Sequence, residues 1–139
     1  MKELTFEKFV IKIPDEYQPT PLPFFTEWIK ALESGEFKQC EGRLLKDGAY
    51  CCLGVLSRIQ GRLDMTEGSD GIGSGHYSGL ALDNPARLVL KGTGDIPSGI
   101  TVTHDGLMVY TPTLAFLNDH GVSFKDIATL IKNLWKSST

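Results

Sequence analysis

No stretch of this 139-residue chain has the roughly 18 consecutive apolar residues that a membrane-spanning helix requires. A secretory signal peptide is not expected either, because charged and hydrophobic residues alternate from the start, with Lys2, Glu3, Glu7 and Lys8. We therefore expect a cytoplasmic protein with no membrane partner.

An excess of positive charge is also missing. The chain carries 14 Lys and Arg residues against 17 Asp and Glu residues, and its formal net charge is -3. No cluster of Lys and Arg is longer than two residues. The charge therefore gives no electrostatic reason to expect a nucleic-acid partner.

Cysteine is scarce, and three residues are too few and too unevenly placed for a disulfide framework. Neighbouring side chains point apart, so Cys51 and Cys52 are poorly placed to bridge each other, and we expect reduced thiols. A zinc site is disfavoured because the spacings of the candidate ligands match no compact motif. Those candidates are Cys40, Cys51, Cys52, His76, His104 and His120. No metal or cofactor is therefore expected.

The length predicts a single domain spanning residues 1–139. Glycine and serine recur through residues 64–82, which predicts a long flexible loop with His76 and Tyr77 near its centre. A loop of this kind is either disordered or functional, and His76 is the histidine most suspected of touching a ligand.

Apolar periodicity predicts an α+β fold, in which about four helices pack around a central buried helix beside a small antiparallel sheet. Thr111 and Pro112 read as an N-cap followed by a first-turn proline, and Ser123 with Asp126 reads as a capping box. The helices are expected at residues 24–33, 51–60, 112–119 and 123–135, with a shorter one at residues 86–91.

The strands are expected mainly near the N-terminus and around residue 105. Residues 4–13 are rich in aromatic and β-branched side chains and predict one strand, followed by a proline-rich connector at residues 17–23. Asp105 and Gly106 separate two alternating segments within residues 100–110 and predict a hairpin with a two-residue turn. A short hairpin or turn is expected between residues 42 and 51.

The charge-free segment from Tyr50 to Leu56 is the predicted centre of the core. A neighbouring imidazole or helix N-terminus could activate Cys51 or Cys52 as a nucleophile, with His76 as its partner. Packing is the favoured reading, because cysteine is among the most buried residue types. A ligand site would then lie at the rim of this segment.

The candidate binding residues combine polar groups at that rim with an aromatic wall and the glycine-rich loop. They are Trp28, Gln39, Arg43, Tyr50, His76, Tyr77, Asn118 and Asp119. For Asn118 and Asp119 a structural reading is favoured, in which their side chains satisfy the backbone of a turn.

Three blocks of sequence carry a family resemblance. They are Trp28-x-x-Ala31-Leu32-x-Ser34-Gly35-x-x-x-Gln39, then Tyr50-Cys51-Cys52-Leu53-Gly54-Val55-Leu56, and finally Leu117-Asn118-Asp119-x-Gly121-x-Ser123-Phe124-x-x-Ile127-Ala128-x-x-Ile131. Together they resemble a family of small uncharacterised proteins common in phage genomes and their bacterial hosts. The middle departs from that family, since a glycine-rich loop and a threonine-rich hairpin replace a longer helical stretch with a tryptophan.

The resemblance implies a small phage-type binding protein, such as a counter-defence factor that sequesters a nucleotide-like signalling ligand or binds a host protein. A homo-oligomer is left open. Two alternatives remain: a cysteine-dependent hydrolase or transferase, and a DNA-binding regulator in which residues 114–135 form a helix-turn-helix. The regulator is disfavoured, because Lys125 and Lys132 are the only Lys or Arg residues of that segment, with Lys136 directly after it. A phage protein of this family would be expected in the host cytoplasm.

Overall fold

A computed structural model describes residues 1–22, 24–41, 45–46, 48–59, 96–110 and 112–137. Its helices are α1 (Phe25–Ser34), α2 (Cys52–Ile59), α4 (Leu114–Asp119) and α5 (Phe124–Leu134). With a four-stranded antiparallel sheet they confirm the predicted α+β class. The glycine-rich loop and the helix expected at residues 86–91 lie outside the described residues.

The main sheet has the strand order β1-β2-β7-β8, and each pairing is antiparallel. Its strands are β1 (Lys2–Phe6), β2 (Phe9–Ile13), β7 (Thr101–His104) and β8 (Leu107–Met108). The single strand predicted for residues 4–13 was wrong. Glu7 takes a left-handed φ of 53°, so the chain reverses there and forms a hairpin without a glycine.

The second hairpin follows the prediction closely. Asp105 and Gly106 have φ values of 54° and 83°, the two positive angles that a type I′ turn needs. His104 lies opposite Leu107 in the register, as expected. β7 also pairs with β2, so the sheet joins the two hairpins.

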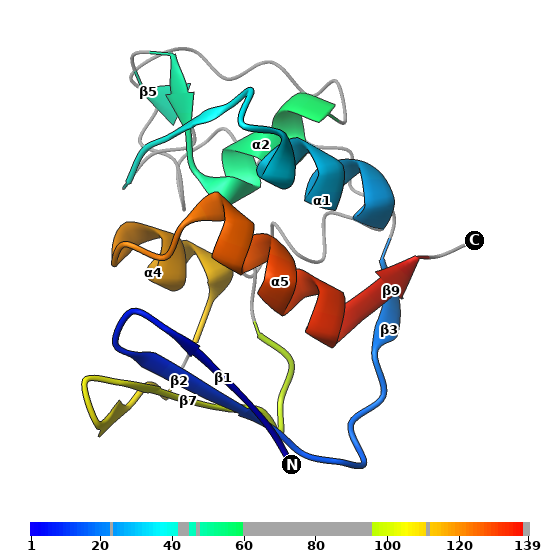
Figure 1. Ribbon diagram of the computed structural model, residues 1–139, viewed down its shortest axis with the longest axis vertical. Helices are drawn as coiled ribbons and strands as arrows, with labels where there is room; N and C mark the ends of the chain where they lie inside the picture. Colours follow the sequence, from blue (N-terminus) through cyan, green and yellow to red (C-terminus); the bar gives the residue numbers. More distant parts are fainter. Residues whose placement is uncertain (23, 42–44, 47, 60–95, 111, 138–139) are drawn as a thin grey trace.

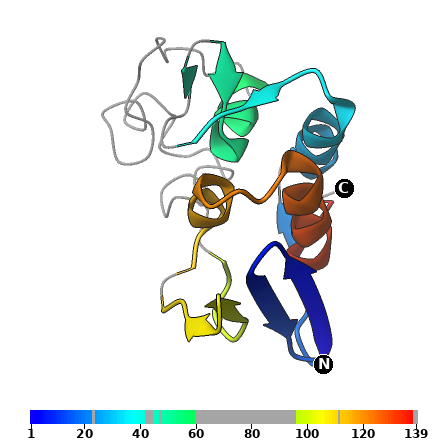
Figure 2. The ribbon, with the colours of Figure 1, turned by 60° about the vertical axis from the view of Figure 1, so that its left-hand side comes forward.

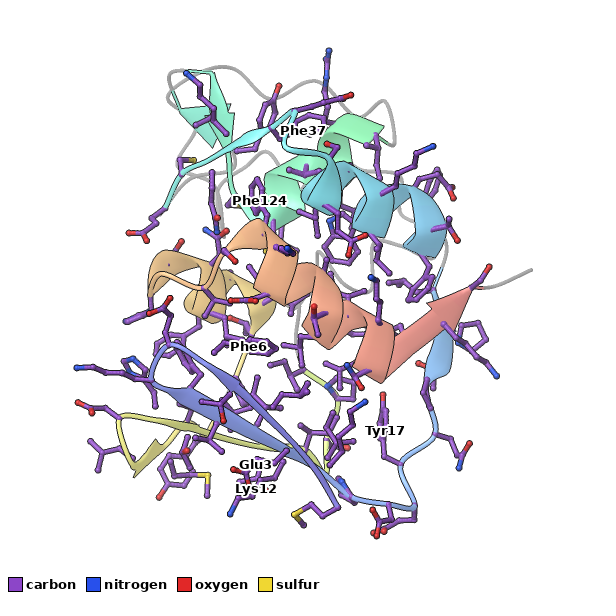
Figure 3. The ribbon with its side chains drawn as sticks, in the orientation of Figure 1. Glu3, Phe6, Lys12, Tyr17, Phe37 and Phe124 are labelled. Atoms are coloured by element: carbon purple, nitrogen blue, oxygen red, sulfur yellow. The ribbon has the colours of Figure 1, made fainter. Side chains whose placement is uncertain are left out.

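The main sheet has an inner and an outer face. Phe9, Ile11 and Ile13 alternate along β2 and are buried, while Glu3 and Lys12 are exposed. Figure 3 shows the last two on the side of the sheet away from the helices. Helices α4 and α5 cover the inner face and lie between the sheet and the α1/α2 pair (Figures 1 and 2).

Two smaller sheets connect segments that are distant in sequence. The proline-rich connector contains β3 (Thr20–Leu22), which pairs in parallel with β9 (Trp135–Ser137). The sequence had predicted that Trp135 is part of the last helix. This was wrong, because Trp135 begins the strand β9. The other sheet has the order β4-β6-β5 and comprises β4 (Lys38–Gln39), β5 (Leu45–Lys46) and β6 (Ala49–Tyr50).

The helix ends follow local capping rules. Ser123 caps α5, with its hydroxyl accepting from the Asp126 N–H at 3.2 Å, as predicted. For α4 the predicted start was wrong, because Thr113 and not Thr111 is the N-cap, and its hydroxyl accepts from the Phe116 N–H at 2.9 Å. Gly35 ends α1 with a φ of 79°.

Helix α2 is the buried helix that the sequence predicted, and residues 51–56 are all buried. Trp28 of α1 is fully buried, and its indole N–H donates to the Cys52 carbonyl at 3.0 Å. At the end of α5, the Leu134 carbonyl accepts a hydrogen bond from the Tyr17 hydroxyl at 2.5 Å. None of the helices in the described part of the chain is both long and apolar enough to span a bilayer.

The substitution Trp28→Phe is expected to lower the free energy of unfolding by about 2 kcal/mol, because it removes both core volume and the bond to Cys52. Trp135→Phe is the matched control, since its indole has no hydrogen-bond partner among the described residues. It should cost about half as much. Urea denaturation at constant m-value measures both, and equal costs would show that the bond contributes nothing.

Candidate functional site

The side chain of Asn118 lies at the centre of the polar contacts between α2, α4, α5 and β4. It is the buried polar residue of the described chain, with an exposed fraction of 0%. Its carbonyl oxygen accepts from Gln39 Nε2 at 2.7 Å and from the Cys52 N–H at 3.3 Å. Its amide nitrogen donates to the Cys40 carbonyl at 2.8 Å and to Asp119 Oδ1 at 3.3 Å. Both lone pairs and both protons of the carboxamide are therefore in use.

This carboxamide takes the place of a peptide group in the β4–β6 ladder. The Cys40 N–H donates to the Tyr50 carbonyl at 2.8 Å, and the next bond of a parallel ladder would run from the Cys52 N–H to the Cys40 carbonyl. Instead, each of these groups bonds to Asn118. The side chain thus satisfies the backbone where the chain leaves the sheet and enters α2.

Gln39 extends the same set of contacts to the start of α5. Its amide nitrogen also donates to the Val122 carbonyl at 2.8 Å, and its carbonyl oxygen accepts from the Phe124 N–H at 3.0 Å. Gln39 therefore caps α5 alongside Ser123. The sequence correctly placed Gln39 and Asn118 near each other, but their hydrogen bonds go to each other and to the backbone. The role of Asn118 is therefore structural, but the backbone groups that its side chain satisfies belong to Cys40 and Cys52, whereas the sequence had predicted the turn after α4.

A shallow hollow opens beside these contacts, with a volume of about 600 Å³. Gln39, Cys40, Glu41, Gly121 and Ser123 line it. None of these five described residues is basic, and Glu41 adds negative charge. The described part of the lining therefore offers no basic side chain to a phosphate group.

The thiols of Cys51 and Cys52 are buried in the core. Burial raises the pKa of Cys51 from its ordinary value of 9.0 to about 12, and hydrogen bonds from the backbone of Gly54 and Leu53 offset this only in part. Burial also raises the pKa of Cys52 well above 9.0, with neighbouring charge adding to the effect. Both thiols are protonated near neutral pH, so the geometry gives no support to the cysteine-dependent hydrolase or transferase.

The remaining predicted binding residues are divided between the core and the undescribed part of the chain. Trp28 is buried with its N–H already bonded, and Tyr50 packs edge-on against Phe37 at a ring separation of 5.3 Å. Arg43, His76 and Tyr77 lie outside the described residues. The structure thus places Gln39, Asn118 and Asp119 together, with Tyr50 opposite Gln39 in the β4–β6 ladder.

His104 and His120, considered above as zinc ligands, do come together. Their ring centroids are 5.2 Å apart, and each ring packs at 4.2 Å against a phenylalanine, His104 on Phe9 and His120 on Phe116. Within the described ranges, no group of three or more His, Cys, Asp or Glu side chains is placed to hold a metal ion. The four rings join the sheet to α4.

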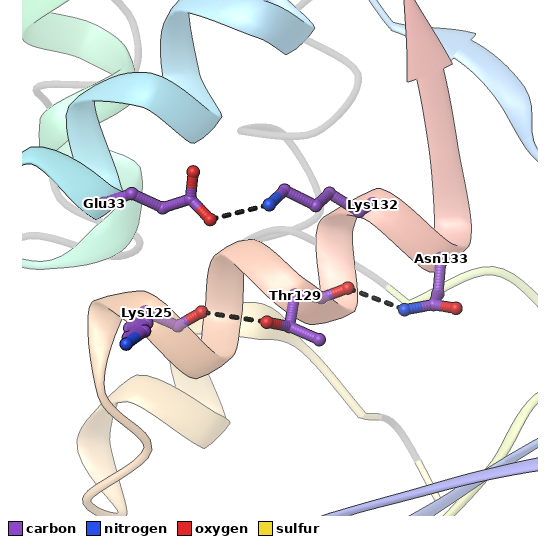
Figure 4. Close-up of polar contacts among 5 residues, drawn as sticks. All are labelled: Glu33, Lys125, Thr129, Lys132 and Asn133. Atoms are coloured by element: carbon purple, nitrogen blue, oxygen red, sulfur yellow. Dashed lines mark hydrogen bonds and ion pairs between the residues drawn. The ribbon is translucent and has the colours of Figure 1, made fainter.

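The pair α4 and α5 offers little surface for DNA. Six of the eleven α5 residues are buried, and Lys132 forms an ion pair with Glu33 of α1 at 2.6 Å (Figure 4). Thr129 and Asn133 bond to carbonyls of their own helix, as the same figure shows. The face that a recognition helix would present is therefore largely in the core.

Sequence reasoning missed an apolar groove beside the second hairpin, with a volume of about 780 Å³. Its apolar lining comprises Ile96, Ile100, Val102, Met108, Val109 and Tyr110. Leu107, Met108 and Tyr110 are exposed by 74%, 48% and 89%. One signal in the sequence pointed to this groove: residues 107–110 carry no charge. Edge strands are usually protected by charged residues, so an uncharged edge strand indicates a binding surface.

Asn118→Ala is expected to lower the free energy of unfolding by about 3 kcal/mol, because it removes four hydrogen bonds, among them the one to the buried Cys52 N–H. Asn133→Ala is the matched control, since the Asn133 amide donates to the Thr129 carbonyl in a half-buried position and should cost about 0.5 kcal/mol. Chemical denaturation of the two variants gives both values. Similar losses would show that the central network is not a main source of stability.

The raised thiol pKa values also predict a loss of stability at alkaline pH. The folded state keeps the Cys51 proton up to a pH of about 12, whereas the unfolded chain releases it above about 9. The contribution of this thiol to the free energy of unfolding should therefore have its full value below pH 9. Above pH 9 the free energy of unfolding should fall by about 1.4 kcal/mol per pH unit. Cys51→Ala should remove that share of the slope in denaturation series at pH 8, 9 and 10. Identical slopes for the two proteins would contradict the assignment.

Comparison with known proteins identifies the family but assigns no activity. A family model described as a domain of unknown function (DUF8296) matches residues 25–135, well over half of the chain. No curated protein and no solved structure matches it. The matched region contains the Asn118 contacts, the thiols and the second hairpin. The chain therefore belongs to the DUF8296 family.

Proposed function

We propose that this protein acts by binding and not by catalysis, and that its ligand is an extended segment of another protein added to the main sheet along β8. The observation that carries the proposal is the exposed apolar edge formed by Leu107, Met108 and Tyr110. Soluble proteins usually protect such an edge with charge, proline or a covering segment, because it pairs readily with another strand. The described part of this chain shows none of these at β8.

The backbone of β8 has the geometry that strand addition needs. The Val109 N–H donates to the Val102 carbonyl at 2.9 Å, and Met108 lies opposite Thr103 between hydrogen-bonded pairs. In an antiparallel pair, the N–H and C=O of such a residue point away from the partner strand. Met108 therefore directs one donor and one acceptor outward from the edge of the sheet.

The groove beside this edge supplies side-chain contacts. Alternate side chains of an added strand would point toward its apolar lining, which includes Ile100, Met108 and Val109. Tyr110 offers a large ring together with a hydroxyl that can donate a hydrogen bond. Backbone pairing would supply general affinity, and the groove would select for apolar residues at every second position.

The geometry favours a protein ligand over the nucleotide-like one. Two of the polar side chains predicted to bind a nucleotide, Gln39 and Asn118, use their hydrogen bonds for the fold. The nearby hollow carries Glu41, whose charge repels phosphate. In the counter-defence role that the family resemblance implies, the ligand would thus be a host protein.

The experiment is selection from a yeast-displayed library of short random peptides, followed by anisotropy titration of one selected peptide. Met108→Pro should weaken binding about tenfold, because it removes the outward N–H without breaking a bond of the β7–β8 ladder. Met108→Thr is the matched control, since it keeps that N–H while shortening the side chain. It should change the Kd by less than about threefold. Chemical shifts should move at Leu107, Met108 and Tyr110.

Two results would overturn the proposal. One is a selected peptide whose affinity is the same for wild type, Met108→Pro and Tyr110→Ser. The other is a stable dimer of the free protein that Met108→Pro dissociates, observed by sedimentation. In that case a second copy of this chain, and not another protein, occupies the edge.

A further inference from the structure

We propose that Cys40 and Cys51 form a redox pair, which closes to a disulfide when the protein meets a peroxide and reopens with a thiol reductant. This inference is independent of the binding role proposed for β8. It rests on the register of β4 and β6, on the different exposure of the two thiols and on the position of Cys52.

The strand register brings the two residues to facing positions. Gln39 pairs with Tyr50 in the parallel β4–β6 ladder, so Cys40 and Cys51 are the next residues along the two chains. The bond from the Cys40 N–H to the Tyr50 carbonyl holds them at this spacing. Neighbouring strands lie about 4.8 Å apart, and disulfides join Cα atoms about 4.4–6.8 Å apart.

The side chains of the pair also share a side. Successive residues of a strand point to opposite faces, and Gln39 turns its side chain toward Asn118. Cys40 therefore leaves β4 on the other face, as does Cys51 following Tyr50. Burial is the main cause of the raised pKa of Cys51, and charge on Cys40 adds to it, in keeping with facing positions of the two residues.

The third cysteine is placed elsewhere. Cys52 follows Cys51 at the start of α2, and its thiol contacts the Leu114 carbonyl at 3.8 Å in the core. It is fully buried, as is Cys51, whereas Cys40 is half-exposed and lines the hollow beside β4. Peroxide therefore reaches Cys40 first, and Cys51 is the thiol beside it.

The reaction balances in two steps. The Cys40 thiolate attacks one oxygen of hydrogen peroxide, the O–O bond breaks, and the released hydroxide takes up a proton to form water. The Cys51 sulfur then displaces hydroxide from the sulfenic acid on Cys40, and the Cys51 proton leaves with it as a second water. Two thiols are oxidised by two electrons, and one peroxide is reduced to two waters.

A disulfide between Cys40 and Cys51 would form next to the backbone groups that Asn118 connects. Asn118 holds both the Cys40 carbonyl and the Cys52 N–H. The new bond would join the same two segments on the opposite face of the ladder and close a short loop between β4 and α2. The wall of the hollow that Cys40 lines would move with it.

The test treats the folded protein with hydrogen peroxide, then alkylates the remaining thiols in denaturant and maps them by peptide mass spectrometry. Wild type should lose about 2 Da without gaining oxygen. It should retain one alkylatable thiol of its three, and dithiothreitol should restore the others. Cys52→Ser is the matched control and should form the same Cys40–Cys51 bond.

The remaining variants separate the two roles. Cys51→Ser should stop at a sulfenic acid on Cys40 that dimedone traps, and Cys40→Ser should keep both of its thiols. Because Cys40 is half-exposed, Cys40→Ser is the variant that remains informative if Cys51→Ser fails to fold. A wild-type protein in which Cys40 reaches sulfinic acid while Cys51 stays alkylatable would overturn the proposal. A Cys40–Cys52 or intermolecular bond would overturn it equally.

Discussion

The buried carboxamide of Asn118 is the interaction on which the rest of the structure depends. A short strand, β4, and the first turn of α2 separate at this point, and the Cys40 carbonyl and the Cys52 N–H bond to Asn118 in place of each other. An unpaired buried donor or acceptor costs about 1–3 kcal/mol, so the separation is tolerated only because one side chain can both donate and accept. Asparagine is short enough to do this from α4 without displacing the apolar residues around it. Leu114 and Leu117 of the same helix remain fully buried.

This constraint also determines where a ligand can bind. Polar side chains in the interior are committed to the backbone, and the two innermost thiols are held neutral by burial. The described interior residues therefore offer no charged or unbonded polar side chain to a ligand. Among the described residues, the helices cover the main sheet on one face only (Figure 2). This arrangement supports the proposed recognition along β8.

The sequence predicted those parts of the fold that short-range chemistry determines. The Asp105-Gly106 turn, the Ser123 cap and the apolar faces of α1, α2 and α5 each depend on residues within a few positions of one another. The hairpin at Glu7 escaped prediction because no glycine, asparagine or proline marks its turn. The pairing of β3 with β9 escaped because it joins distant segments, one of them rich in proline. For the site, proximity of Gln39 and Asn118 was predictable, but mutual satisfaction of their hydrogen bonds was not. Exposure of β8 depends on its place in the strand order, which only the assembled sheet decides.

The parallel pairing of β3 with β9 has a consequence for how the chain is made. Thr20 pairs with Trp135, and the Tyr17 hydroxyl reaches the Leu134 carbonyl, so an early segment has no partner until a very late one has been synthesised. Contacts of such high sequence separation form slowly and only after a large loop has closed. The β1–β2 hairpin can form on the ribosome, whereas the layer of α1 against α5 has to wait until residues 124–134 have been translated. During that interval the apolar faces of both helices are open to chaperones and proteases.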